Sequence, residues 1–128
     1  MRMVCSSCPS PVFRQTNWTS YIEPPAGQLR LTEAPVIDFV RNLFTAAVQH
    51  TPGPFFSTGG DEINKRCYEE DDVVQGTLNK TGQTLEQALD NFTQKTHAAL
   101  LESGKIPVVW QEMVTSHQVK LDPKTVVL

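Results

Sequence analysis

The chain has 128 residues, which is enough for one domain with a substantial hydrophobic core. Apolar residues make up 39% of it, charged residues 20%, and the formal net charge is −3, so there is no basic excess to hold nucleic acid or an anionic lipid surface. The apolar run over residues 1–4 is too short for a signal peptide, and no segment approaches membrane-spanning length. We therefore expect one globular domain that has neither a nucleic-acid nor a membrane partner.

The first part of the chain is irregular. Residues 1–32 show no sustained hydrophobic period and contain several residues that interrupt regular structure, namely Pro9, Pro11, Pro24, Pro25 and Gly27. We predict an irregular N-terminal loop segment over 1–32, followed by a folded domain over 33–128.

A helix and a strand are predicted next. Apolar residues recur at helical spacing between residues 35 and 50, namely Val36, Ile37, Phe39, Val40, Leu43, Phe44, Ala47 and Val48. Residues 51–54 carry two prolines and a glycine, which end this helix. Residues 55–58 then have the pattern of a short buried strand that ends at Gly59 and Gly60.

A long polar segment follows, over residues 63–83, with a short helix expected over about 72–79. Its acidic run, residues 69–72, is predicted to be a solvated loop or a helix start. A second clear helix begins at Thr84, which is spaced as a capping box with Gln87, and ends at Gly104.

Two more strands are predicted, over residues 106–110 and 125–128. Alternating helices and strands are typical of βαβ units with a parallel sheet. The active residues of such folds lie at the carboxyl ends of the strands. Asp61 and Glu62 follow the first strand, and Trp110 and Glu112 lie at the end of the second.

The pair Asp61 and Glu62 is the leading candidate for chemistry. Gly59 and Gly60 let the backbone turn sharply and let a bulky group approach closely. Adjacent residues of an extended chain point in different directions, so the two carboxylates would take different roles. One proton donor and one ionised carboxylate are what glycoside hydrolysis needs. Taken alone, the four residues also fit a turn with two solvated acids, and Trp110 alone fits core packing.

Cysteines, sequons and histidines give weaker signals. Cys5 and Cys8 lack the second pair that a zinc site needs, so a disulfide from either of them to Cys67 is the alternative. Three N-x-[ST] sequons favour a secreted protein and begin at Asn17, Asn79 and Asn91. No spacing relates the three histidines, for which surface positions are expected; they are His50, His97 and His117.

Two segments together resemble a known family. Residues 57–63, STGGDEI, followed by Cys67 and by residues 104–112, GKIPVVWQE, are similar to the β-N-acetylhexosaminidases of glycoside hydrolase family 20. Residues 24–29, PPAGQL, further resemble the fungal members. The resemblance implies an α/β fold, as a fragment of about three strands of a (β/α)8 TIM barrel. Residues 33–128 would then be a partial catalytic domain.

The resemblance also implies roles for residues. In this family the acetamido oxygen of the substrate attacks its own anomeric carbon, so no enzyme nucleophile and no cofactor is needed. Asp61 would orient the acetamido group, and Glu62 would protonate the leaving oxygen and then activate water. Trp110 would line the sugar pocket, with Glu112 beside it and Gly60 allowing the sugar to approach.

Further expectations come from the same resemblance. The implied partner is a carbohydrate that ends in N-acetylhexosamine, and the full-length protein could form a homodimer. The implied location is secreted or lysosome- or vacuole-like, and Cys8 rather than Cys5 is the implied partner of Cys67.

Two features depart from the family pattern. The family motif usually begins with His or Asn where this chain has Ser57. A barrel of this type takes about 250 residues and eight strands, so the isolated chain is expected to lack part of the binding pocket.

Two alternatives stay open at this point. Residues 59–63, GGDEI, also resemble the GGDEF signature of diguanylate cyclases, which lies at the tip of a β-hairpin and uses magnesium. Residues 64–70 are polar and do not alternate, which argues against a second hairpin strand. The third possibility is a non-catalytic remnant with open sheet edges.

Overall fold

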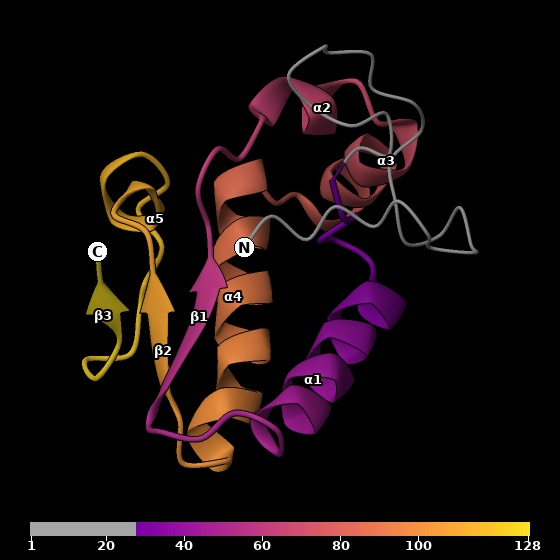
Figure 1. Ribbon diagram of the computed structural model, residues 1–128. Helices are drawn as coiled ribbons and strands as arrows, with labels where there is room; N and C mark the ends of the chain where they lie inside the picture. The colour runs from indigo at the N-terminus through magenta and orange to yellow at the C-terminus, as the bar shows by residue number, and fades with distance from the viewer. Residues whose placement is uncertain (1–27) are drawn as a thin grey trace, which may run out of the picture.

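The computed structural model describes residues 28–128 (Figure 1). Its elements follow the predicted order, with two short helices, α2 and α5, that the sequence pattern did not reveal. They are α1 (Ala34–Val48), β1 (Phe55–Gly59), α2 (Lys65–Glu69), α3 (Asp72–Thr81), α4 (Leu85–Glu102), β2 (Ile106–Val109), α5 (Glu112–Thr115) and β3 (Val126–Val127). None of the helices in this part of the chain is long and apolar enough to cross a membrane.

The three strands form a parallel sheet in the order β1-β2-β3, as expected from the βαβ pattern. In Figure 1 all three arrows point the same way, α4 runs behind β1, and α2, α3 and α5 lie beyond the ends of the arrows. The carboxyl ends of the strands therefore share one end of the molecule. Within the described residues, β1 and β3 each pair only with β2.

One core cluster lies between β1 and the helices α1 and α4. Phe56 of β1 contacts Phe44 of α1, with ring centroids 5.4 Å apart. The cluster's buried members are Leu29, Val36, Val40, Phe44, Val48 and Leu100. The helix side of β1 is thus packed, whereas Phe55 and Ser57, whose side chains alternate to the other side, are exposed. The expectation of a buried strand therefore holds for one face of β1 only.

A second core cluster lies towards the carboxyl ends of the strands. It joins α3, α4, α5 and the end of β2, and its buried members are Leu31, Tyr68, Val74, Leu78, Ala88, Leu89, Val109, Met113 and Val119. Trp110 is not among them and is 41% exposed, so it is not a core residue. This cluster is the platform beneath the residues that follow β1 and β2.

Side chains cap two of the helices where the sequence placed their starts. Thr84 and Gln87 form the predicted capping box of α4, with Gln87 N–H donating to Thr84 Oγ1 and Thr84 N–H donating to Gln87 Oε1. Helix α3 begins at Asp72, as predicted, and Asp71 is its N-cap, accepting hydrogen bonds from the N–H groups of Val73 and Val74.

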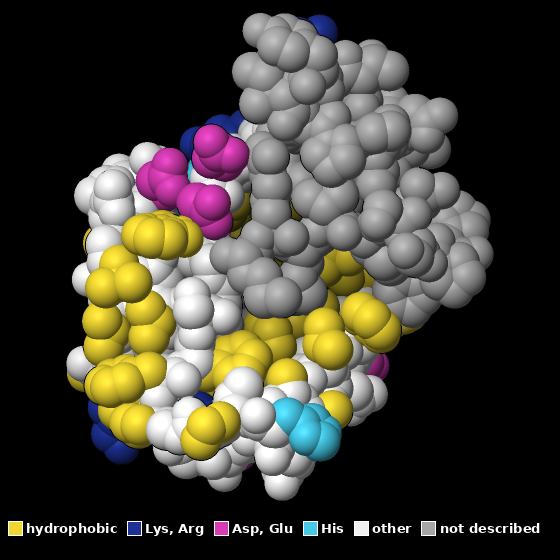
Figure 2. Space-filling view, in the orientation of Figure 1, with side chains coloured by type: hydrophobic (Ala, Val, Ile, Leu, Met, Phe, Trp, Pro, Cys, Tyr) yellow, Lys and Arg dark blue, Asp and Glu magenta, His cyan; other side chains and the backbone are white. Residues whose placement is uncertain are grey.

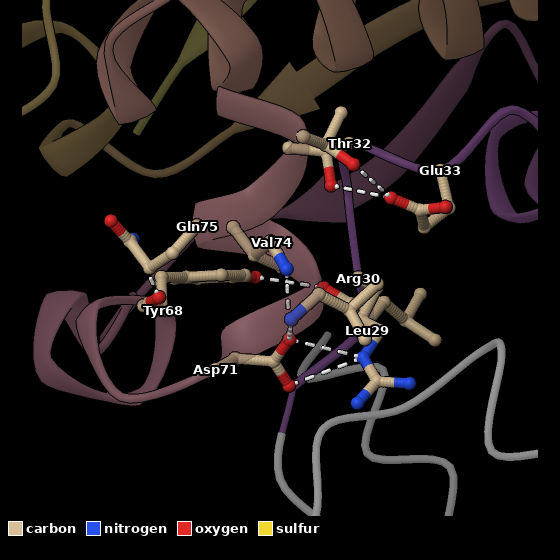
Figure 3. Close-up of polar contacts among 10 residues, drawn as sticks. Leu29, Arg30, Thr32, Glu33, Tyr68, Asp71, Val74 and Gln75 are labelled. Atoms are coloured by element: carbon tan, nitrogen blue, oxygen red, sulfur yellow. Dashed lines mark hydrogen bonds and ion pairs between the residues drawn. The ribbon is translucent and has the colours of Figure 1, made fainter. Parts of the chain in front are cut away.

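The acidic run is a helix start, one of the two predictions for it, but Asp71 is not solvated. Its carboxylate is buried and accepts hydrogen bonds from Arg30 Nε at 3.2 and 3.1 Å (Figure 3). The hydroxyl of Tyr68 donates to the carbonyl of Leu29 in the same region, at 3.1 Å. These contacts fasten the segment before α1 to helices α2 and α3. Arg30 is 41 residues from Asp71, which is why the acidic run by itself did not reveal the pair.

Two histidines expected at the surface are buried, while His50 is exposed as expected. His117 Nδ1 lies 3.3 Å from Glu86 Oε2, and His97 Nε2 lies 3.0 Å from Thr58 Oγ1. Their partners are 31 and 39 residues away along the chain. The surface positions predicted for His97 and His117 are therefore wrong, because the spacing of residues in one sequence does not show contacts between distant residues.

Candidate active site

The acid pair Asp61 and Glu62 lies directly beyond the carboxyl end of β1. The backbone turns here through three positive φ angles within four residues, at Gly59 (+77°), Gly60 (+100°) and Glu62 (+53°). A positive φ is easily adopted by glycine but costs energy for a residue with a side chain, and such strain concentrates at functional sites. The two glycines therefore make the turn, and Glu62 is held in an unusual conformation at its end.

The two carboxylates occupy different surroundings, as their adjacency predicted. Asp61 is partly buried, and its Oδ1 atom is shielded from solvent. Glu62 is exposed. One acid is therefore held within the turn while the other is open to an approaching molecule.

The end of β2 lies beside this turn. The N–H of Trp110 donates to the carbonyl of Gly59 at 3.1 Å, which extends the parallel pairing to the last residue of β1. Glu112 follows two residues later, partly buried, as the first residue of α5. The structure thus brings the two predicted groups together, at the tips of adjacent strands.

Figure 2 shows acidic side chains gathered on the surface between α5 and the segment that leads from β1 to α2. Hydrophobic side chains lie next to them, over the strands. The exposed large hydrophobic residues of the strands and their ends are Phe55, Trp110, Val127 and Leu128. Carboxylates beside exposed aromatic and apolar groups are suited to a sugar, which has polar hydroxyls and an apolar ring face.

Met113 of α5 packs against the backbone of the turn. A Cβ atom added at Gly60 would lie 2.5 Å from Met113 Cγ and 2.6 Å from its Sδ, far inside van der Waals contact. Gly60 is therefore required both by its positive φ and by the closeness of Met113. The sequence predicted close approach at Gly60, but could not identify a side chain of the same chain as the approaching group.

A histidine that the sequence did not single out lies beneath the turn. His97 of α4 contacts Thr58, the residue before Gly59, and burial lowers the pKa of His97 to about 4. Its imidazole is therefore neutral over the range in which an exposed histidine titrates. Both residues line a cavity of about 140 Å³ on the helix side of β1, together with Gly59, Gly60 and Asp61.

The remaining predicted residues are only partly within the described range. Cys67 is buried on α2, while Cys5, Cys8 and Asn17 lie outside the described residues, so the disulfide stays a prediction. Asn79 is exposed on α3, whereas Asn91 is partly buried in the middle of α4. The domain boundary at residue 32 likewise stays a prediction.

The topology after the acid pair contradicts the diguanylate cyclase alternative. A GGDEF motif needs a second strand that pairs antiparallel with the first, but the residues after Glu62 lead into helix α2, which Asn64 caps by accepting a hydrogen bond from Arg66 N–H. Strand β1 pairs instead with the distant strand β2. Among residues 28–128 there is also no cluster of three or more His, Cys, Asp or Glu side chains placed to hold a metal ion.

In a comparison with protein families, a family model matches nearly the whole chain. The family described as "Glycosyl hydrolase family 20, catalytic domain" matches residues 3–128. The chain belongs to glycosyl hydrolase family 20. The resemblance carried by the acid pair and the GKIPVVWQE segment is confirmed.

Curated relatives include proteins from fungi, insects and mammals. A beta-hexosaminidase of Arthroderma benhamiae is 29% identical over 113 residues, covering 85% of this chain and 18% of the relative. A chitooligosaccharidolytic beta-N-acetylglucosaminidase of Bombyx mori is 27% identical and covers 82% of this chain and 19% of the relative. The alpha subunit of mouse beta-hexosaminidase is 31% identical, in a match that covers 70% of this chain and 17% of the relative. The chain thus spans less than a fifth of the length of each of these relatives.

Solved structures agree on the fold. The exo-beta-N-acetylglucosaminidase of Vibrio harveyi, a family 20 protein, superposes with a TM-score of 0.71 at 16% identity, covering 92% of this chain and 18% of that one. The Flavobacterium johnsoniae chitobiase superposes with a TM-score of 0.65 at 22% identity, and the match covers 90% of this chain and 16% of the chitobiase. The three-stranded parallel sheet with its helices is therefore a fragment of the family's (β/α)8 barrel, as predicted.

Proposed function

We propose that this chain carries the acid pair of a β-N-acetylhexosaminidase, which removes terminal non-reducing N-acetylhexosamine residues from glycans or chitooligosaccharides. One observation carries the proposal: in a chain of family 20, Asp61 and Glu62 lie at the tip of β1, in different surroundings and beside the tip of β2. The chain spans less than a fifth of the length of these relatives. We therefore assign the reaction to a complete barrel that contains this segment.

The proposed reaction proceeds in two steps without a nucleophile from the protein. The acetamido oxygen of the substrate forms a bond to the anomeric carbon as the glycosidic bond breaks, and Glu62 gives its proton to the leaving oxygen. Asp61 accepts a hydrogen bond from the acetamido N–H and stabilises the positive charge of the resulting oxazolinium. Glu62, now a carboxylate, then removes a proton from the water that attacks the anomeric carbon, which restores both the acetamido group and the acid.

The exposure of the residues supports this division of roles. Glu62 is open to solvent, as a group that must meet both a leaving oxygen and a water should be, and the partly buried Asp61 is better placed to hold one fixed contact. Trp110, 41% exposed beside the pair, offers a flat apolar face to the sugar. Glu112 is proposed as a neighbouring polar contact, and Gly60 keeps the turn free of a side chain.

The proposed setting is the secretory route, either outside the cell or in a lysosome- or vacuole-like compartment. The three sequons and the proposed Cys8–Cys67 disulfide support it, because both modifications belong to that route. A free thiol at Cys67 in peptides from non-reduced, secreted protein would contradict the disulfide.

Glu62→Gln in a complete family 20 barrel that carries residues 28–128 tests the proposed function. The variant cannot donate a proton, so hydrolysis of ordinary glycans should fall by about 10² to 10⁴-fold. Aryl glycosides with a strongly acidic phenol as leaving group need little protonation and should lose far less. Asp61→Asn is the matched variant and should impair both substrates, because every turnover passes through the oxazolinium.

Equal losses on both substrate types for Glu62→Gln would contradict the assignment of Glu62 as the acid. If the parent barrel had no N-acetylhexosaminidase activity at all, the proposed function itself would be wrong. A non-catalytic remnant, the remaining alternative from the sequence, predicts such an inactive parent barrel.

A further inference from the structure

Strand β1 has an irregularity immediately before the acid pair. Its residues pair one to one with β2 up to Ser57 and Val108, but the next pair joins Gly59 to Val109. Thr58 is therefore an extra residue in β1, opposite no residue of β2. Such a bulge bends a strand and redirects the side chains that follow it, and bulges occur often beside active sites.

Two hydrogen bonds hold Thr58 in this position. Its hydroxyl lies 3.4 Å from the carbonyl oxygen of Val108 and 3.0 Å from His97 Nε2. We assign the single hydroxyl proton to the bond with Val108, so the oxygen accepts a hydrogen bond from His97 in the tautomer that carries its proton on Nε2. A single side chain thus joins β1 to its neighbour β2 and to α4 behind the sheet.

The surroundings make this connection important for the turn. The backbone from Gly59 to Asp61 lines a cavity of about 140 Å³ and is not packed solidly from the helix side. Apolar packing alone therefore constrains the turn only in part, and Met113 supports it at Gly60. The hydrogen bond between His97 and Thr58 fixes the residue that precedes the turn.

His97 is suited to this role because its protonation state is constant. It is 6% exposed, and its burial keeps the imidazole neutral at the pH values of most cellular compartments. A neutral imidazole donates one hydrogen bond, so the Thr58 hydroxyl has the same hydrogen-bond partner in every turnover. Because His97 is buried on the helix side of β1, it is not proposed as a group that contacts the sugar.

We propose that His97 is a positioning residue for the acid pair, acting through Thr58 and the bulge that aims residues 59–62. The proposal rests on the proposed function, since it assigns His97 a part in the same site. It also identifies Thr58 as the group through which His97 acts.

Thr58→Val and Thr58→Ser test the connection in a complete family 20 barrel that carries residues 28–128. Valine keeps the shape of threonine but has no hydroxyl, whereas serine keeps the hydroxyl. We expect Thr58→Val to lower kcat by about tenfold or more with little change in KM, because a misplaced acid slows the chemistry more than it weakens sugar binding. Thr58→Ser should retain most of the activity.

His97→Leu and His97→Gln test the histidine in the same barrel. Leucine removes the donor, and we expect a loss in kcat similar to that of Thr58→Val, while glutamine retains an N–H donor and should restore part of it. The double variant His97→Leu with Thr58→Val should be no worse than either single variant, since both remove the same hydrogen bond. His50→Gln is the control, because His50 is exposed at the end of α1.

Several results would overturn the proposal. They are an unchanged kcat in folded His97→Leu, a loss of kcat that only follows the fraction of folded protein, and additive effects in the double variant. If the barrel is active and depends on Glu62 while His97→Leu has wild-type kcat, only this inference fails and the proposed function stands.

A measurement that needs no enzymatic activity tests the positioning role of His97 separately from the proposed function. Amide ¹H–¹⁵N shifts of Gly59, Gly60 and Asp61 in the 128-residue chain should change in both Thr58→Val and His97→Gln, and not in His50→Gln. Unchanged shifts in the two test variants would contradict the proposal even if the proposed function had already failed.

Discussion

Single residues around the acid pair are constrained mainly by residues far away in the sequence. Gly60 adopts a φ of +100°, and Met113 occupies the space that a side chain at Gly60 would need. His97, on another element, contacts the residue that precedes the turn. The conformation of the turn is thus a product of three elements, although the turn itself is four residues long.

Gly60→Ala should destabilise the chain for two separable reasons. The positive φ costs about 1–2 kcal/mol for a residue with a Cβ, and overpacking against Met113 costs about 1–3 kcal/mol more. Met113→Ala alone should cost about 2–5 kcal/mol by leaving a cavity. In the double variant the added methyl has room, so its loss should be smaller than the sum of the two. Urea unfolding of the four proteins measures this, and strictly additive losses would show that Met113 does not restrict Gly60.

The pKa of His97 predicts a pH dependence of stability. Burial lowers this pKa to about 4, below the value of about 6.5 in the unfolded chain. Between these two values the unfolded state binds more protons than the folded state, so the free energy of unfolding falls as the pH falls from 6.5 towards 4. Relative to His97→Gln, the wild-type chain should lose on the order of 2 kcal/mol between pH 7 and pH 4.5.

The measurement is urea unfolding of both proteins at each pH. The difference between them isolates His97 from the other titrating groups. A difference that does not change with pH would mean that His97 is accessible to protons in the folded chain.

At the scale of elements, buried polar contacts join the loop before α1 to the segment between β1 and α4, which contains helices α2 and α3. Asp71 both caps α3 and accepts the hydrogen bonds of Arg30, and its side chain is only 2% exposed. Helix α3 and the loop are therefore joined at a single carboxylate. The acid pair connects β1 to this segment. The contact between Arg30 and Asp71 therefore supports the residues that follow the candidate site.

Asp71→Ala should destabilise the chain by about 3–5 kcal/mol, because it removes the N-cap and takes away the carboxylate that faces the buried Arg30. Asp71→Asn keeps a capping oxygen and should be about 1 kcal/mol less damaging. Asp72→Ala is the control, since Asp72 is exposed in the first turn of the same helix and should cost about 0.5 kcal/mol. Equal losses for Asp71→Ala and Asp72→Ala in urea unfolding would show that the ion pair adds nothing.

At the scale of the whole molecule, the fold is one part of a barrel. The sheet has three strands, and apolar side chains are exposed on its strands and ends, among them Phe55 at 57% and Leu128 at 57%. A closed barrel removes all sheet edges and covers the side chains that point inward. These exposures are what a section of such a barrel should show.

The isolated 128-residue chain should therefore have no N-acetylhexosaminidase activity. A pocket that orients one sugar needs groups from several strand ends, and β1 and β2 supply only the acid pair and its neighbours. Assayed on a chromogenic N-acetylglucosaminide, the chain should give no turnover above that of its own Glu62→Gln variant. Turnover that depends on Glu62 would show that three strands are enough for a working site.

The order of the elements and the location of the acid pair could be predicted from sequence because their signals are local. The apolar period of α1, the capping box at Thr84 and Gln87, and the turn of two glycines each lie within a few consecutive residues. Short-range geometry decides helices, caps and turns, so a single sequence shows them. Helix α2 was missed because it has five residues, too few for a periodic signal, although Asn64 is a recognisable N-cap.

The support of the acid pair could not be predicted, because it depends on contacts between distant residues. His97 and Thr58 are 39 residues apart, and Arg30 and Asp71 are 41 apart. Nothing in either local segment distinguishes a buried, paired histidine or aspartate from a solvated one. Only when α4 packs behind β1, and the loop at Arg30 packs on α3, does burial remove water from these groups and make their hydrogen bonds to each other necessary.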